Sequence, residues 1–284
     1  MKFVSLFFFL VLAQLSFTQS ELQQKEARLN ESLLKLRSAK TDEEMDRLNI
    51  VFKKEMEAFL KSEGAFDYPF TLLKTIAVLD SEDELVRIIN WNIEYTDYSY
   101  SYGGFVLKKE EGKEKVTVTE LIDKLDPYAP KPEGIIDAKN WYGALYYKIL
   151  PFGHHGQTEY LLIGWDGGTT GSNFKLMDVL TFSGNTPKFG SPVFKANRTT
   201  LKRVVYEYSN LSNMSMRFDA KNGRKATVGA RVIANRLTDT TTAIVVALGT
   251  NDMISKSATW YPDYAIDTVM DQVGTVPVLW VNLE

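Results

Sequence analysis

Four consecutive polar or flexible residues, Gly249–Asp252 (GTND), follow the apolar run Ala243–Leu248. A second apolar run, Val276–Val281, comes after a stretch with helical character, Tyr264–Val273. This order predicts a strand–loop–helix–strand unit with the tetrad at the end of its first strand. Open α/β sheets bind ligands at the carboxyl ends of their strands, so the tetrad stands where chemistry could occur. An ordinary strand-end turn is the alternative, because Gly, Asn and Asp all favour turns.

The tetrad and its flanks resemble the third conserved block of the SGNH (GDSL-like) hydrolases. The approach to it, with Asp219-Ala220, Gly223-Arg224 and Gly229, extends the resemblance over about residues 219–284. The resemblance implies a serine esterase or acyl-hydrolase. In it the amide of Asn251 would donate a hydrogen bond to the oxyanion, and Gly249 would permit the tight turn. These two residues are the candidate catalytic residues if the protein is active.

The serine nucleophile and the histidine base that such a hydrolase needs are not evident in the sequence. No Gly-Asp-Ser motif occurs, and the nearest imitation, Tyr160–Gly167, carries Gly167 where a serine is needed. No histidine follows Asn251. A serine needs an adjacent base to become nucleophilic, so the sequence favours a catalytically incomplete segment and leaves enzymatic activity uncertain.

The histidines are His154 and His155, in a glycine-flanked segment that predicts a turn or exposed loop. Because a triad is defined by geometry, either could still serve a distant serine. As metal ligands they are disfavoured, since neighbours on a strand point in opposite directions. Asp166 stands in Trp165–Gly168, where a turn is favoured over a calcium loop. We predict no metal and no cofactor.

The N-terminus predicts export. Lys2 precedes an apolar run, Phe3–Leu12, which is too short to span a bilayer and is typical of a secretory signal peptide. We assign residues 1–19 to it, with cleavage after Ala13 or nearer Ser20. We therefore expect a periplasmic or extracellular protein with no stable membrane insertion after signal cleavage. The 284 residues contain no cysteine, which excludes disulfides and a thiol nucleophile. The net charge of -3 argues against a nucleic-acid partner.

Residues 20–62 predict a helical hairpin. Apolar residues recur at three- and four-residue steps without Gly or Pro up to Lys61, and Thr41-Asp42 marks the break, with Glu44 completing a capping box. Such helices pack on something. A solvated hairpin is favoured over a partner-binding coil, and either the β-domain or another copy of the chain could cover its apolar stripe.

Residues 63–218 predict an antiparallel β-rich domain, either a sandwich, a barrel or a curved meander. Strand-sized runs such as Arg87–Ile93 and Lys175–Phe182 alternate with turn signals. This region resembles a group of uncharacterised exported proteins of the Bacteroidetes, which implies export and a bacterial source but no assigned chemistry. The resemblance rests on four short sequence segments, Asn90–Asn92, Trp141–Tyr147, Leu162–Gly167 and Arg203–Tyr208.

An aromatic strand could bind a glycan. Alternation over Tyr98–Tyr102 predicts three rings on one side of a strand, and Trp91, Tyr95 and Trp141 could extend a sugar-stacking face. A cross-strand aromatic ladder within a half-buried sheet is the favoured alternative.

The composition changes again near Phe218-Asp219, where an Ala-, Val- and Thr-rich segment, residues 219–284, begins without a linker. A natural two-part protein and a joined reading frame (a chimera) both explain the change. The expected fold is α+β, with a helical hairpin, a β-rich middle domain and a short C-terminal α/β segment. The expected function is a non-catalytic binding or structural role, with a glycan or an ester as a possible ligand and an SGNH-type esterase as the alternative.

Overall fold

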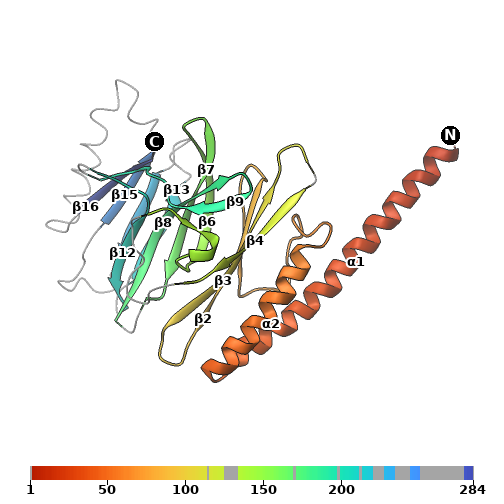
Figure 1. Cartoon of the computed structure of the whole chain (residues 1–284), viewed down its shortest axis with the longest axis horizontal. Coiled ribbons are helices and arrows are strands. Elements are labelled where there is room, and N and C mark those ends of the chain that lie inside the picture. The colour runs from red at the N-terminus through yellow and green to blue at the C-terminus, as the bar shows by residue number, and fades with distance from the viewer. Residues whose placement is uncertain are drawn as a thin grey trace. The chain divides into compact units, whose positions relative to one another are not determined.

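A computed structural model gives the fold shown in Figure 1. It describes residues 2–113, 115–124, 134–168, 171–196, 199–210, 213–219, 227–233, 244–249 and 278–283. Two helices precede a series of mainly antiparallel strands, which confirms the expected α+β class. The chain divides into two compact units, Met1–Asp123 and Lys124–Glu284, and each is described by itself.

Two helices open the first unit. Helix α1 spans Lys2–Ser38 and helix α2 spans Asp42–Leu60. Thr41 is the N-cap of α2, because its Oγ1 accepts the Glu44 N–H at 3.3 Å while the Glu44 carboxylate accepts the Lys40 N–H at 3.3 Å. The predicted break at Thr41-Asp42 is therefore confirmed, with its cause. Over the part of the chain that the structure describes, neither helix combines the length and apolar character needed to cross a membrane.

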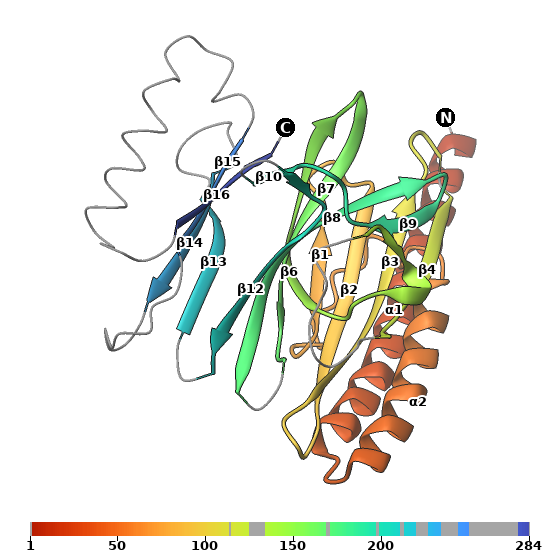
Figure 2. The same cartoon turned by 60° about the vertical axis from the view of Figure 1, so that its left-hand side comes forward.

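The same unit contains a four-stranded antiparallel sheet in the order β1-β2-β3-β4. Its strands are β1 (Ala77–Asp80), β2 (Val86–Glu94), β3 (Tyr100–Lys109) and β4 (Val116–Ile122). The helical hairpin covers one face of this sheet (Figure 2) and shares one hydrophobic core with it. That core includes Leu29, Leu33, Phe52, Phe59, Ile89, Trp91, Phe105 and Leu107. The apolar stripe of the hairpin is thus buried against its own sheet.

A polar row on α2 fixes the hairpin in place. Its members recur at helical spacing, so they lie on one side of the helix facing the sheet. The contacts are Asp42 with Thr96 (2.9 and 3.0 Å), Asp46 with the Tyr95 hydroxyl (2.6 Å), Asn49 with the Trp91 indole N–H (2.9 Å) and Lys53 with Glu120 (3.1 Å). Polar contacts at these set positions define the register between helix and sheet, which apolar packing alone specifies less sharply.

The second unit contains two sheets. The strands of the first sheet are β5 (Ile136–Asp137), β6 (Leu145–His154), β7 (Gln157–Asp166), β8 (Ser172–Ser183), β9 (Thr186–Phe189) and β12 (Val204–Ser209), with a short 3-10 helix at Ala138–Asn140. Their order is β5-β9-β8-β7-β6, and β12 also pairs with β8. Strand β8 is long enough to pair with β9 through Leu180–Ser183 and with β12 through Ser172–Met177. One core joins this sheet to β10 and β13 through residues such as Ile163, Val179, Phe194 and Met216.

The other sheet crosses the composition change at Phe218-Asp219. Its order is β11-β10-β16-β15-β14-β13. The strands are β10 (Phe194–Ala196), β11 (Thr199–Leu201), β13 (Asn213–Asp219), β14 (Thr227–Ile233), β15 (Ile244–Gly249) and β16 (Val278–Leu283). The expected boundary falls at the end of β13, which pairs with β14 along its whole length. Strands from both sides of that boundary therefore complete one sheet.

Strands β15 and β16 pair in parallel, with Ile244 opposite Val278 and Gly249 opposite Leu283. A parallel pair requires a crossover connection between its strands, as the predicted strand–helix–strand unit has. The expected helix at residues 264–273 lies outside the described residues.

Candidate functional site

Of the two predicted oxyanion residues, the structure describes Gly249, which is the last residue of β15. The strand thus extends one residue beyond the apolar run Ala243–Leu248 from which it was predicted. Asn251 and Asp252 lie outside the described residues. Their proposed role in catalysis therefore stays a prediction.

The two histidines form the tip of the β6–β7 hairpin. His155 and Gly156 are the turn, with φ of 49° and 76°, the paired positive values of a type I′ turn. The predicted turn is thus confirmed, but the expected divergence of the two rings is wrong. Because His155 leaves the extended conformation, its ring centroid lies 4.1 Å from that of His154.

His154 also has a carboxylate partner that the sequence did not reveal. Its Nδ1 lies 3.0 Å from Oε1 of Glu159, and both side chains are largely buried. Glu159 Oε2 is buried without a hydrogen-bond partner in the described structure. A carboxylate on Nδ1 orients an imidazole and leaves Nε2 as the acceptor. Within the described ranges, no group of three or more His, Cys, Asp or Glu side chains could hold a metal ion.

The aromatic residues do not form the predicted sugar-stacking face. Trp91 and Trp141 are completely buried. Tyr98 occupies the β2–β3 turn with φ of 65°, and β3 begins only at Tyr100, so the three rings do not share one strand. Tyr102 is buried as well, and the glycan proposal loses most of its expected residues.

Asp166 and Asp178 take part in contacts that stabilise the fold. Asp166 is buried and accepts the Gly168 N–H at 3.2 Å, as the predicted turn requires. Asp178 forms an ion pair with Arg203 (2.8 Å) in which both side chains are inaccessible to solvent. Burial raises the pKa of Asp178, and the guanidinium of Arg203 opposes that change. The Arg203 guanidinium also lies 4.5 Å from the Tyr142 ring centroid, so this network anchors β12 to its surroundings.

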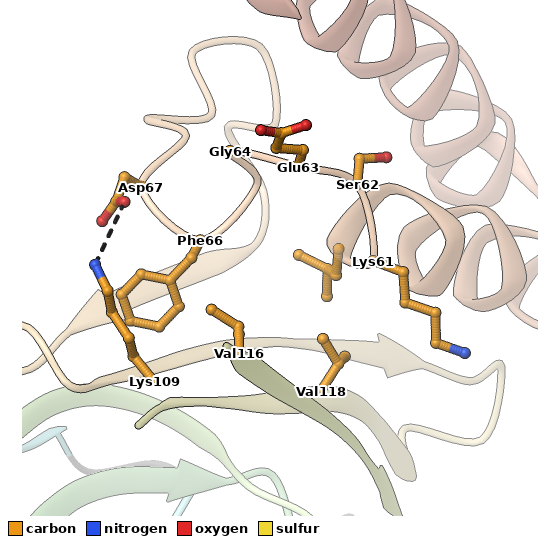
Figure 3. A pocket seen from close by; sticks show the side chains of 10 residues that line it. Lys61, Ser62, Glu63, Gly64, Phe66, Asp67, Lys109, Val116 and Val118 are labelled. Atoms are coloured by element: carbon orange, nitrogen blue, oxygen red, sulfur yellow. Dashed lines mark ion pairs between the residues drawn. The ribbon is translucent and has the colours of Figure 1, made fainter. Parts of the chain in front are cut away.

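The first unit contains a pocket of about 590 Å³, within the range that binds small molecules. It lies beyond the end of α2, between the segment Leu60–Asp67 and the paired ends of β3 and β4. Figure 3 shows Val116 and Val118 side by side on β4, with the Phe66 ring near Val116. No sequence motif marks this pocket.

The pocket exists because the sheet continues where α2 stops. Side chains alternate along a strand, so Lys109 points to the same face as Phe105 and Leu107, which the hairpin covers. Val116 and Val118 continue that face on β4, opposite Lys109 and Leu107. Helix α2 ends at Leu60 and the chain turns at Gly64 with φ of 75°, so Lys109, Val116 and Val118 at the ends of the two strands are only partly covered.

A buried carboxylate holds the wall of the pocket. Glu26 of α1 accepts hydrogen bonds from the Tyr68 hydroxyl (2.8 Å), the Leu72 N–H (2.6 Å) and the Thr71 hydroxyl (3.3 Å). Burial, with the neighbouring Glu26, raises the pKa of Tyr68 to about 12. Arg87 donates to the Tyr68 carbonyl oxygen at 2.7 Å and forms a two-point ion pair with Asp80. The segment that borders the pocket is thus fixed to both the helix and the sheet.

Charged groups surround the apolar floor unequally. The Lys109 ammonium lies 4.0 Å from an Asp67 carboxylate oxygen, beyond hydrogen-bond distance, and 5.5 Å from the Phe66 ring centroid. Lys61 is engaged by Glu57 at 2.5 Å, and Figure 3 shows its side chain directed away from the floor. Lys109 is therefore the cation best placed to meet a ligand.

No protein-family model, no curated protein and no solved structure matches the chain. The SGNH-like and Bacteroidetes-like resemblances therefore stay expectations from the sequence, and functional inference depends on the geometry.

Proposed function

We propose that this protein is an exported, non-catalytic binding protein whose ligand occupies the pocket between Leu60–Asp67 and the ends of β3 and β4. The observation that carries the proposal is the pocket itself, with a volume of about 590 Å³, an apolar floor and a charged rim. Small-molecule sites combine apolar surface with placed polar groups, and this pocket has both, with apolar Leu60, Phe66, Val116 and Val118 among lining residues that are otherwise polar, charged or glycine.

The length of α1 supports export. Helix α2 has 19 residues, and the last 19 residues of α1, numbers 20–38, suffice to run antiparallel beside it. Figure 1 shows α1 continuing well past the end of α2. The hairpin therefore does not need residues 2–19, the segment proposed as the signal peptide. Mass spectrometry of protein secreted from a bacterial host should find a new N-terminus near residue 20. An uncleaved chain retained in the cytoplasm would contradict export.

Binding can be tested with a neutral fluorescent probe, N-phenyl-1-naphthylamine, on the chain from residue 20 onward. We expect saturable enhancement of the probe fluorescence, because the floor residues Phe66, Val116 and Val118 exclude water. Val118→Trp should abolish the enhancement by filling the cavity. Val51→Trp is the matched control, because Val51 is exposed on α2, and it should bind the probe as the parent does.

A second, smaller substitution in the pocket tests the site without depending on whether Val118→Trp folds. Val116→Phe should weaken probe binding in part while the circular dichroism spectrum stays that of the parent. Equal probe binding by the parent, Val118→Trp and Val116→Phe would overturn the assignment of the site. Soluble polysaccharide, added as a competing ligand, should leave the probe bound.

Two observations favour the esterase as a second candidate. Strand β15 ends at Gly249, where the resemblance requires it, and Glu159 orients the imidazole of His154. Labelling with a fluorophosphonate probe tests this function, since it reacts with an activated serine. A single labelled serine whose labelling is lost in Asn251→Ala would establish a hydrolase site. Absence of labelling beside a labelled control hydrolase would remove this candidate.

A further inference from the structure

We infer that the pocket of the first unit selects apolar monocarboxylates, with the ligand carboxylate bound by Lys109 and its apolar body on Phe66, Val116 and Val118. This inference rests on the proposed binding role and adds the chemical class of the ligand.

The apolar floor of the pocket, formed by Phe66, Val116 and Val118, indicates that the ligand has an apolar body. Phe66 is almost fully buried, and the two valines pack at the margin of the main core. Two cations already lie near the Phe66 ring, because the Arg87 guanidinium and the Lys109 ammonium are 5.8 and 5.5 Å from its centroid. A cation placed on this floor would stand beside two positive groups and be repelled.

The surroundings of the Lys109 ammonium indicate that the ligand carries an anionic group. Its stem is largely covered, with 33% of the side chain exposed, so its ammonium is held at the edge of the floor. Its ion pair with Asp67 is long, at 4.0 Å, and the Asp67 side chain is 74% exposed, so water weakens that pair. An ammonium has three donors, and a ligand carboxylate can accept from them in a less hydrated place than Asp67 occupies.

The other charges at the rim do not compete for this role. Arg87 is neutralised by its two-point ion pair with Asp80. Lys61 is paired with Glu57. Figure 3 places the Glu63 carboxylate on the far side of the opening from Lys109. One anionic group at the Lys109 edge, joined to one apolar body, is therefore the ligand that this arrangement fits.

Displacement of bound N-phenyl-1-naphthylamine tests the inference with matched ligand pairs at neutral pH. Decanoate is compared with decanol, and 2-naphthoate with 2-naphthol, so that an aliphatic and an aromatic body are both examined. We expect the carboxylate of at least one pair to displace the probe at about tenfold lower concentration than its neutral counterpart. That preference should shrink as salt is added.

The variants assign the preference to a residue. Lys109→Met should lower carboxylate affinity about ten- to hundredfold, as expected for loss of a hydrogen bond between charged groups, and leave the alcohols unchanged. Lys61→Met is the matched control and should behave as the parent.

The two proposals fail in different ways. If the parent binds no probe, the binding role itself fails. If the probe binds but each acid and its neutral counterpart displace it equally, only the carboxylate inference is overturned. A preference that survives Lys109→Met, or is lost in Lys61→Met, overturns it as well.

Discussion

Replacing Gly103 with alanine tests how the helical hairpin is held on the four-stranded sheet. Gly103 pairs with Trp91 across β2 and β3, and a Cβ at this position would lie 2.4 Å from two carbons of the indole. Carbon atoms do not approach so closely, so the indole must move. Trp91 is completely buried, contacts Phe52 edge-to-face at 5.0 Å and donates a hydrogen bond to Asn49 at 2.9 Å. Any movement therefore disturbs the seam between α2 and the sheet.

The size of the effect follows from these contacts. Overpacking a well-filled core costs about 1–3 kcal/mol, and losing the hydrogen bond to Asn49 adds about 0.5–1.5 kcal/mol. We expect Gly103→Ala to lower the free energy of opening of the first unit by about 2–4 kcal/mol.

Amide hydrogen exchange is the appropriate assay, because two compact units need not unfold together. Protection should fall at the amides of β2, β3 and α2 in the first unit. Gly153→Ala is the matched control, since no heavy atom lies within 4 Å of a Cβ at that strand position. Unchanged protection of β2 and β3 in Gly103→Ala would refute the packing described for Trp91.

Three further perturbations have defined outcomes. Glu26→Gln weakens three hydrogen bonds to a buried carboxylate and should destabilise the loop after α2 by about 1–3 kcal/mol. The expected readout is faster proteolytic cleavage between residues 66 and 75, and cleavage at the parent rate would contradict the prediction. Burial, followed by the hydrogen bond to Asp46, raises the pKa of Tyr95 to about 12. The folded state therefore keeps this proton where the unfolded chain loses it, so stability present below pH 10 should fall as the pH rises toward 12, less steeply in Tyr95→Phe. Asp178→Asn leaves Arg203 as an uncompensated buried charge and should cost about 3–5 kcal/mol in urea unfolding of the second unit, with a midpoint equal to that of the parent as the refuting result.

Local chemistry explains which elements the sequence predicted well. The cap at Thr41 and the turn at His155-Gly156 depend on neighbouring residues alone, and both are confirmed. The strand-like run Arg87–Ile93 also located β2, whose Ile89, Trp91 and Ile93 belong to the core. Tyr98 was misplaced because the aromatic alternation continues past the strand into a turn, where φ is positive.

The pocket could not be predicted, because it depends on segments that are distant in sequence. Leu60–Asp67 forms one wall, while Lys109, Val116 and Val118 form the other. In the sequence, a charged stretch separates Lys108 from Val116 and Val118, and no motif in it indicates a pocket. Only the length of α2 relative to the sheet shows that these side chains are only partly covered. The contact of His154 Nδ1 with Glu159 was missed for the related reason that it forms across a hairpin.

Ligand binding in the pocket of the first unit can be observed residue by residue in an NMR titration of the nitrogen-15-labelled chain from residue 20 with decanoate. We expect saturable shifts confined to the amides of Leu60–Asp67 and of the Lys109 and Val116–Val118 ends of β3 and β4. We also expect that Lys109→Met reduces those shifts and Lys61→Met does not. Shifts absent at saturating ligand, or centred on another part of the chain, would contradict ligand binding in this pocket.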